Sequence, residues 1–177
     1  SEPAKYTPAQ TLAVIATAEQ RPTEAIEVCA DLPKTGPWSE CLLAAAEKLP
    51  PSTPDNILVL CALLEGDKRG ECHFRLAERT ENIKYCQLAQ PFQEDCQLHL
   101  FTKKLLQRNI ETYGQAAEIA RDLQLDLTEA NPQTVVYRHL LSRQEGVAIP
   151  SCTHQPNTAA CRRAAEGLYV DRLRYAR

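Results

Sequence analysis

The sequence predicts an all-α fold of stacked antiparallel helical hairpins. Alanine, leucine, glutamate, glutamine and arginine are frequent and only 6 of the 177 residues are glycine, which favours helices because straight-chain residues lose little rotamer freedom in them. The 12 prolines fall mostly between stretches with apolar residues at helical spacing, where proline starts or ends a helix. The 8 cysteines form four close pairs around turn signals. We therefore expect one folded unit, 1–177, that forms a solenoid or a compact superhelix.

The first half of the chain contains the regular part of this pattern. An opening helix is expected within 1–23, at about 8–19. Three hairpins follow at 24–50, 56–80 and 82–106, and each of them contains one cysteine pair. An acidic residue comes directly before the second cysteine of each pair, at Glu40, Glu71 and Asp95. Acidic residues suit the positive end of a helix dipole, so a helix is expected to begin there.

The second half departs from the pattern. A hairpin without cysteine is expected at 109–145, with helices at 109–123 and 132–144. Asn131 would cap the second helix and Pro132 would occupy its first position. A divergent terminal hairpin at 150–177 follows a loop at 146–150 and carries the last cysteine pair. Terminal repeats are often atypical because one face meets solvent.

The cysteine spacing predicts disulfides across turns. The sequential pairs are Cys29 with Cys41, Cys61 with Cys72, Cys86 with Cys96, and Cys152 with Cys161. Two antiparallel helices joined by a short turn bring facing Cα atoms within the roughly 4.4–6.8 Å that a disulfide requires. Eight cysteines allow about 105 connectivities, and the placement of the turns favours the sequential one.

The segments between partner cysteines contain residues that favour turns. They are Pro33, Gly36 and Pro37 in the first segment, Gly66 and Gly70 in the second, Pro91 in the third, and Pro156 in the fourth. None of these residues is expected to continue a helix. Each pair should therefore join the end of one helix to the start of the next.

Charge, hydropathy and cysteine content exclude some classes of protein. With 20 basic and 23 acidic residues the formal net charge is -3, so no global field would draw the protein to nucleic acid or an anionic membrane. No apolar run approaches the roughly 20 residues that span a bilayer. Structural disulfides indicate an exported protein that is periplasmic, outer-membrane-associated or extracellular. The start at Ser1 is compatible with a removed signal peptide or a lipid anchor upstream, or equally with a trimmed chain.

One alternative is a small protein of the mitochondrial intermembrane space. Cys86 and Cys96 have the CX9C spacing of such proteins, in which both cysteines lie inside one helix. Here Pro91 and the glycines and prolines between the other partners should break such a helix.

Metal sites and catalytic motifs have little support. His73, His99, His139 and His154 show no CxxC or HxxxH ligand spacing, so no metal is expected and the histidines are interpreted as partly exposed helix residues. Thiol redox catalysis would need a closer dithiol, and no P-loop, GxSxG or GxGxxG sequence is present. No cofactor is therefore expected. The rival class is an enzyme whose site is assembled from distant residues, such as His99, His139 and several carboxylates.

Two features are candidate partner-binding surfaces. The C-terminal stretch carries a basic and aromatic set of residues, Arg162, Arg163, Tyr169, Arg172, Arg174 and Tyr175. Its alternative interpretation is a solvated last helix whose arginines favour the negative dipole end. Arginine, tyrosine and tryptophan are common interface anchors. The single tryptophan, Trp38, lies in the first turn region. It is interpreted either as an exposed contact residue or as a residue buried under the loop.

The hairpins with an alanine-rich second helix, as at Leu42 to Ala46 and Leu76 to Glu78, resemble the tetratricopeptide-like and Sel1-like repeats of exported, cysteine-rich bacterial proteins. The resemblance covers about 24–105 and returns at 152–168. It implies an exported scaffold that binds peptides or proteins. We therefore expect a non-enzymatic binding or assembly module, such as the soluble part of a lipoprotein.

Overall fold

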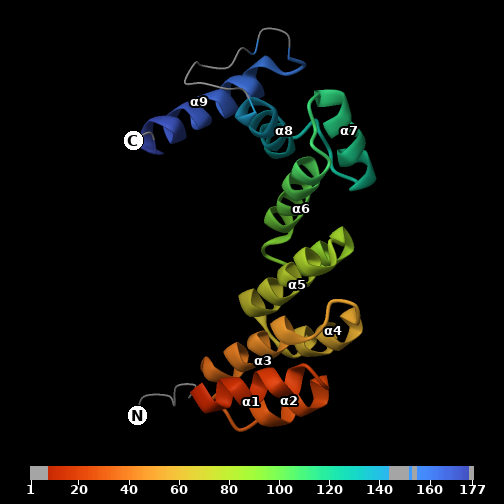
Figure 1. The fold of residues 1–177 in the computed structure, drawn as a ribbon, viewed down its shortest axis with the longest axis vertical. Coiled ribbons are helices and arrows are strands. Elements are labelled where there is room, and N and C mark those ends of the chain that lie inside the picture. The colour runs from red at the N-terminus through yellow and green to blue at the C-terminus, as the bar shows by residue number, and fades with distance from the viewer. Residues whose placement is uncertain (1–7, 144–151, 153–154, 176–177) are drawn as a thin grey trace. The chain divides into compact units, whose positions relative to one another are not determined.

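The computed structural model describes residues 8–143, 152 and 155–175, and the regular elements among these residues are all helices (Figure 1). The chain forms two compact units, 1–96 and 97–177. None of the described helices is long and apolar enough to cross a membrane. The predicted all-α class is confirmed.

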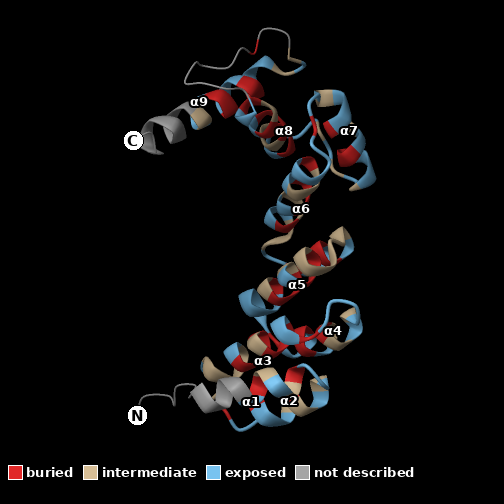
Figure 2. Cartoon of the chain, in the orientation of Figure 1, coloured by how far each residue is buried: buried red, intermediate tan, exposed pale blue. Residues whose placement is uncertain are grey.

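The first unit is a series of short helices that pack on their neighbours in the chain. They are α1 (Pro8–Ala18), α2 (Pro22–Cys29), α3 (Pro37–Lys48), α4 (Pro54–Leu63), α5 (Gly66–Thr80) and the 3₁₀ helix η1 (Ile83–Leu88), and α6 (Gln93–Gln107) begins in this unit. Proline opens α1 to α4, because the first helical residue needs no backbone N–H donor. Each of these helices contains buried residues, which Figure 2 marks along the chain.

All four disulfides join sequential cysteines. The Cα atoms of the partners lie 5.7, 5.5, 5.5 and 5.7 Å apart from the first pair to the last. In the first two pairs the cysteines lie on successive α-helices, α2 with α3 and α4 with α5. Cys86 lies on η1 and Cys96 on α6, on either side of the turn at Gln90 and Pro91. The CX9C pair is therefore not contained in one helix.

The expectation that Gly70 does not continue a helix was wrong, whereas Gly66 does lie at the break between α4 and α5. Gly66 is the first residue of α5, with a φ of 55°, a conformation that glycine adopts without strain. Gly70 lies inside the same helix, where a Cβ atom would collide with the carbonyl group of Gln90 and would lie 3.0 Å from the Ala89 oxygen. Gly70 is thus needed for close packing of the following turn against α5, and the reversal before α5 occurs at Leu64 and Glu65.

The first arm of the third hairpin also differs from the prediction. It is the six-residue 3₁₀ helix η1 rather than an α-helix. Asn82 caps η1, because its side chain accepts a hydrogen bond from the backbone N–H of Lys84 at 3.1 Å. Cys96 follows Cys86 by only 10 positions, so this disulfide closes over a short helix and a turn.

The second unit contains the rest of α6 and then α7 (Tyr113–Asp122), α8 (Ala130–Ser142) and α9 (Thr158–Tyr175). Thr112 and Gln115 form a capping box at the start of α7, as their sequence spacing allows. Asn131 does not cap α8, contrary to prediction. Glu129 is the N-cap, and the N–H of Gln133 donates to the Glu129 carbonyl at 3.3 Å. The helix therefore begins two residues earlier than expected, and Pro132 is tolerated within its first turn.

The terminal staple does not join two helices. Cys152 lies outside any helix and Cys161 lies in α9, so the described part of the expected hairpin at 150–177 is a loop residue and one helix. The expected loop at 146–150 lies outside the described residues. α9 packs on α8 through an apolar cluster formed by Tyr137, Leu141, Cys152, Ala160, Cys161, Ala164 and Ala165.

Candidate functional site

The candidate site is an open groove along one face of α5 in the first unit. One part of it, about 400 Å³ in volume, is lined by Glu47, Arg75, Glu78 and Arg79. The adjoining part, about 270 Å³, is lined by Glu71, Phe74, Arg75, Glu78 and Phe92. Because the two parts share Arg75 and Glu78, we treat them as one site and name it the α5 groove.

The periodicity of α5 forms this groove. Glu71, Phe74 or Arg75, and Glu78 follow one another at intervals of three or four residues and therefore share one helix face. The opposite face carries Cys72, Leu76 and Ala77, which are buried in the core. A short polar segment thus has one face in the core and one face lined with charge.

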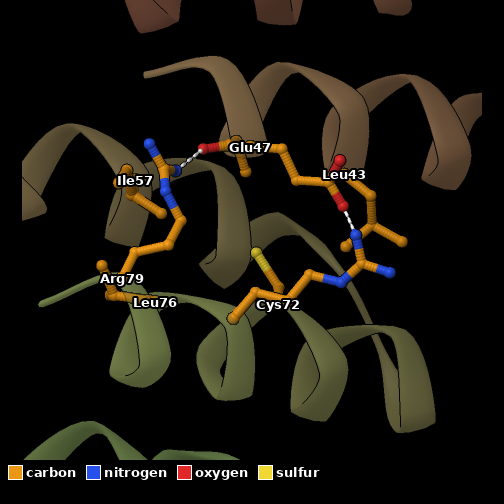
Figure 3. A pocket seen from close by; sticks show the side chains of 8 residues that line it. Leu43, Glu47, Ile57, Cys72, Leu76 and Arg79 are labelled. Carbon is orange, nitrogen blue, oxygen red and sulfur yellow. Dashed lines mark hydrogen bonds and ion pairs between the residues drawn. The ribbon is translucent and has the colours of Figure 1, made fainter. Parts of the chain in front are cut away.

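A small cavity shares residues with the groove. This cavity of about 10 Å³, room for about one water, lies between α3, α4 and α5 (Figure 3). Its walls include Leu43, Ile57, Leu76 and the Cys72 sulfur. Its other lining residues include Glu47, Arg75 and Arg79, which also line the groove.

Arg75 lies at the centre of the groove and pairs with two carboxylates. Its guanidinium contacts Glu47 of α3, and its Nη2 lies 2.7 Å from Oε1 of Glu71, one turn earlier on α5. The Arg75 side chain is 45% exposed, so the stabilisation from each pair is small. The pairs instead fix the direction of Arg75 and link α5 to α3.

Arg79 faces the carboxyl end of α3. Its Nη1 donates to the Ala46 carbonyl at 2.8 Å, and its Nη2 donates to the Leu49 carbonyl. Such carbonyls lack partners within their own helix, and a cation there is favoured by the helix dipole. Burial lowers the pKa of Arg79, although an arginine stays protonated in proteins.

Phe92 reaches the groove from the turn between η1 and α6. The N–H of Phe92 donates to the Ala89 carbonyl at 2.6 Å, and the turn lies against α5 at Gly70. The staple between Cys86 and Cys96 closes the same turn. Phe74 and Phe92 thus give one end of the groove two half-buried aromatic side chains.

The sequence-predicted binding residues lie elsewhere or outside the described side chains. Trp38 is half-buried, with Lys34 Nζ 3.8 Å from its ring centroid, and it does not line the α5 groove. Arg162 and Arg163 are exposed on α9. The side chains of Tyr169, Arg172, Arg174 and Tyr175 lie outside the described residues.

Two histidines are buried, contrary to the expectation of partly exposed helix residues. His73 is 6% exposed and its Nδ1 bonds the Arg69 carbonyl at 2.9 Å. Burial is the main reason why the pKa of His73 is lowered. His139 is 7% exposed and its Nε2 bonds the Ile110 carbonyl at 3.0 Å. His99 is exposed on α6, and His154 lies outside the described residues.

The groove residues were not identified from the sequence. A face with alternating acids and arginines is also typical of a solvated helix, so α5 by itself gives no signal. The missing information is tertiary, because Glu47 and Phe92 come from other elements. What the groove offers chemically is charged and aromatic contact. No cluster of three or more histidine, cysteine or acidic side chains suited to a metal ion occurs within the described part of the chain.

The comparisons with known proteins add no relative to this description. No protein-family model, curated protein or solved structure compared with the chain matches it.

Proposed function

We propose that the protein is a non-enzymatic module that binds a peptide segment of another protein in the α5 groove. The observation that carries the proposal is the groove itself, an open surface that combines two aromatic side chains with ionic groups. Aromatic and arginine side chains are enriched where proteins bind one another.

The composition of the groove favours binding over catalysis. Its lining side chains are two arginines, three glutamates and two phenylalanines. The histidines named for a possible enzyme do not line it, since His99 lies on α6 and His139 bonds a backbone carbonyl in the second unit. No histidine, serine, threonine, cysteine or lysine is among the groove residues, so the usual nucleophiles of covalent catalysis do not line it.

We extend the proposal to the location and architecture of the protein. Four disulfides among 8 cysteines suit an oxidising environment. We infer a bacterial periplasmic, outer-membrane-associated or secreted protein, with the chain as the soluble part of a lipoprotein in the second case. Stacked tetratricopeptide-like or Sel1-like hairpins would present the groove on an extended surface.

The test is a selection of random-sequence displayed peptides on the full oxidised chain. Peptides that bind by the groove should lose about tenfold or more in affinity, measured by calorimetry, for a variant with Phe74→Ala and Phe92→Ala. The matched control is Val59→Ala, which changes a 47% exposed side chain on α4 and should leave the affinity unchanged. Selected peptides that bind the groove variant as well as the original chain, or a selection without binders, would contradict the proposal.

A further inference from the structure

We propose that the 270 Å³ end of the α5 groove receives one aromatic side chain of the bound peptide, stacked on the guanidinium of Arg75. This inference rests on the proposed function and names the class of side chain that the groove recognises. The pocket is lined by Glu71, Phe74, Arg75, Glu78 and Phe92. It opens to solvent and adjoins the rest of the groove at Arg75 and Glu78. One side chain can therefore enter while the backbone that carries it lies along α5.

The charged side chains of the pocket are already engaged with other charges of the protein. The Arg75 guanidinium contacts Glu47, and its Nη2 lies 2.7 Å from Oε1 of Glu71. Oε2 of Glu71 also lies 3.8 Å from Nζ of Lys68, and Glu78 has a partner as well. A charged ligand would compete with these contacts, whereas an uncharged side chain leaves them intact. The pocket therefore favours an uncharged side chain.

The contacts of Arg75 leave the flat face of its guanidinium for an aromatic ring. The N–H donors of a guanidinium lie in the plane of the group, so the contacts with Glu47 and Glu71 are made at its edge. The Arg75 side chain is still 45% exposed. A guanidinium stacks on a ring by its planar face, where its positive charge meets the negative face of the π-system. Pairing at the edge and stacking on the face can therefore occur together.

Phe74 and Phe92 provide the apolar part of the pocket. They come from α5 and from the turn before α6, and each is half-buried. Aromatic rings attract one another in offset or edge-to-face contacts beyond the effect of the area that they bury. An aliphatic side chain would also gain burial here, but it has no π-system to attract Arg75. The combination of two rings with a guanidinium therefore favours an aromatic side chain.

The volume of the pocket suits a single ring. At about 270 Å³ it lies just below the range of roughly 300–1,000 Å³ that holds drug-sized ligands and cofactors. An entering ring would displace several waters, since each occupies about 30 Å³. Aromatic side chains that fill such pockets contribute much of the binding energy in protein interfaces.

The inference can be tested by NMR titration of the full oxidised chain with four small probes. They are the N-acetyl N-methylamides of phenylalanine, cyclohexylalanine, lysine and glutamate. The phenylalanine probe should shift the amide signals of 71–78 and Phe92, and the lysine and glutamate probes should shift them far less. Cyclohexylalanine has a similar shape but no π-system, so it should bind about two- to fivefold more weakly, as expected for the loss of an exposed cation–π contact.

Two variants test where the ring binds. Arg75→Lys keeps the charge but removes the planar face, so it should reduce the preference for phenylalanine over cyclohexylalanine. Phe92→Leu keeps an apolar side chain but removes a ring, and it should weaken the phenylalanine probe about two- to tenfold. The matched control is Arg21→Lys, at an exposed arginine that pairs with Glu24 outside the groove, and it should have no effect. Unchanged amide signals outside the groove show that each variant is folded.

The outcomes separate this inference from the proposed function. Equal binding of cyclohexylalanine, stronger binding of lysine or glutamate, or an unchanged preference in Arg75→Lys would overturn the inference. Library peptides that bind the groove but contain no aromatic residue would overturn it while the proposed function stands. If peptides bind but the probes do not, cyclohexylalanine replaces the aromatic residue of a peptide, and an unchanged affinity overturns the inference. Absence of both groove-binding peptides and probe binding would overturn both.

Discussion

The two units stabilise similar short helices in different ways. In 1–96 one disulfide closes each of the three hairpins. The helices that these disulfides join are between 6 and 15 residues long. In 97–177 no disulfide lies between α6, α7 and α8. There the helices share an apolar cluster of Phe101, Leu105, Ile110, Ala116, Ile119, Ala120 and Val136. Covalent closure and core packing thus serve the same purpose in one chain.

In the second unit, hydrogen bonds of polar side chains connect segments that no disulfide joins. His139 of α8 and Arg143, which directly follows α8, reach back to Ile110 and Asn109 in the turn before α7. The hydroxyl of Tyr137 accepts from the backbone N–H of Asn157 at 2.9 Å, and the Asn157 amide donates to Gln133 at 3.1 Å. A lost buried partner costs more than a typical hydrogen bond contributes. The cysteine-free hairpin is therefore specified by several weaker contacts, where the first unit uses one strong bond per hairpin.

The largest effect should come from the apolar cluster of the second unit. Leu105→Ala removes a fully buried side chain and should lower the free energy of unfolding by about 2–5 kcal/mol. The neighbouring Leu106 is 64% exposed, so Leu106→Ala should change it by less than about 0.5 kcal/mol. Urea unfolding followed by signals from 97–143 measures both. Equal effects of the two substitutions would contradict the packing-dependent account.

Removing a disulfide of the first unit should have the second-largest effect on stability. Replacing Cys61 and Cys72 together by alanine should cost about 3 kcal/mol, because the unfolded chain regains the freedom of a loop of 11 residues. Hydrogen exchange should then accelerate in α4 and α5 and remain unchanged in α7 and α8. An equal loss of protection in both units would show that the staples stabilise the chain as a whole, and the contrast between the units would fail.

A smaller effect distinguishes two helical glycines. Gly70→Ala should destabilise the first unit by about 1–3 kcal/mol, because the new methyl group collides with the carbonyl of Gln90. Gly114 in α7 has no such neighbour, so Gly114→Ala should stabilise the second unit by about 0.5–1 kcal/mol. Thermal unfolding of the two variants should therefore shift in opposite directions. A stabilising Gly70→Ala would mean that the turn does not pack tightly on α5.

The smallest expected effect is a pH dependence from His73. Because its pKa is lowered in the folded protein, the unfolded chain binds a proton more readily than the folded one. The stability from neutral His73 is complete above the unfolded pKa of about 6.5 and is lost as the pH falls through the lowered folded pKa. His73→Asn, which keeps a donor toward Arg69, should flatten this loss between pH 7 and pH 5 in denaturant titrations. His99→Asn, on an exposed residue, should not.

The local features of this fold could be predicted from the sequence, and the features that depend on contacts between elements could not. Proline spacing and the cysteine pairs predicted the order of helices and the disulfides, because both act within a dozen residues. Gly70 was misinterpreted because the need for a glycine inside α5 comes from the Gln90 carbonyl, which is 20 residues away in the sequence. The burial of His139 depends on Ile110, and the groove depends on Glu47 and Phe92 meeting α5.

The spacing of the staples has a consequence for how the protein is made. From the first pair to the last, the second cysteine follows its partner by 12, 11, 10 and 9 positions. No disulfide links a cysteine of one pair to a cysteine of another. Each bond can therefore close soon after its own dozen residues emerge from a ribosome or a translocation channel, before the next pair appears. The order of emergence therefore favours the sequential connectivity over the others.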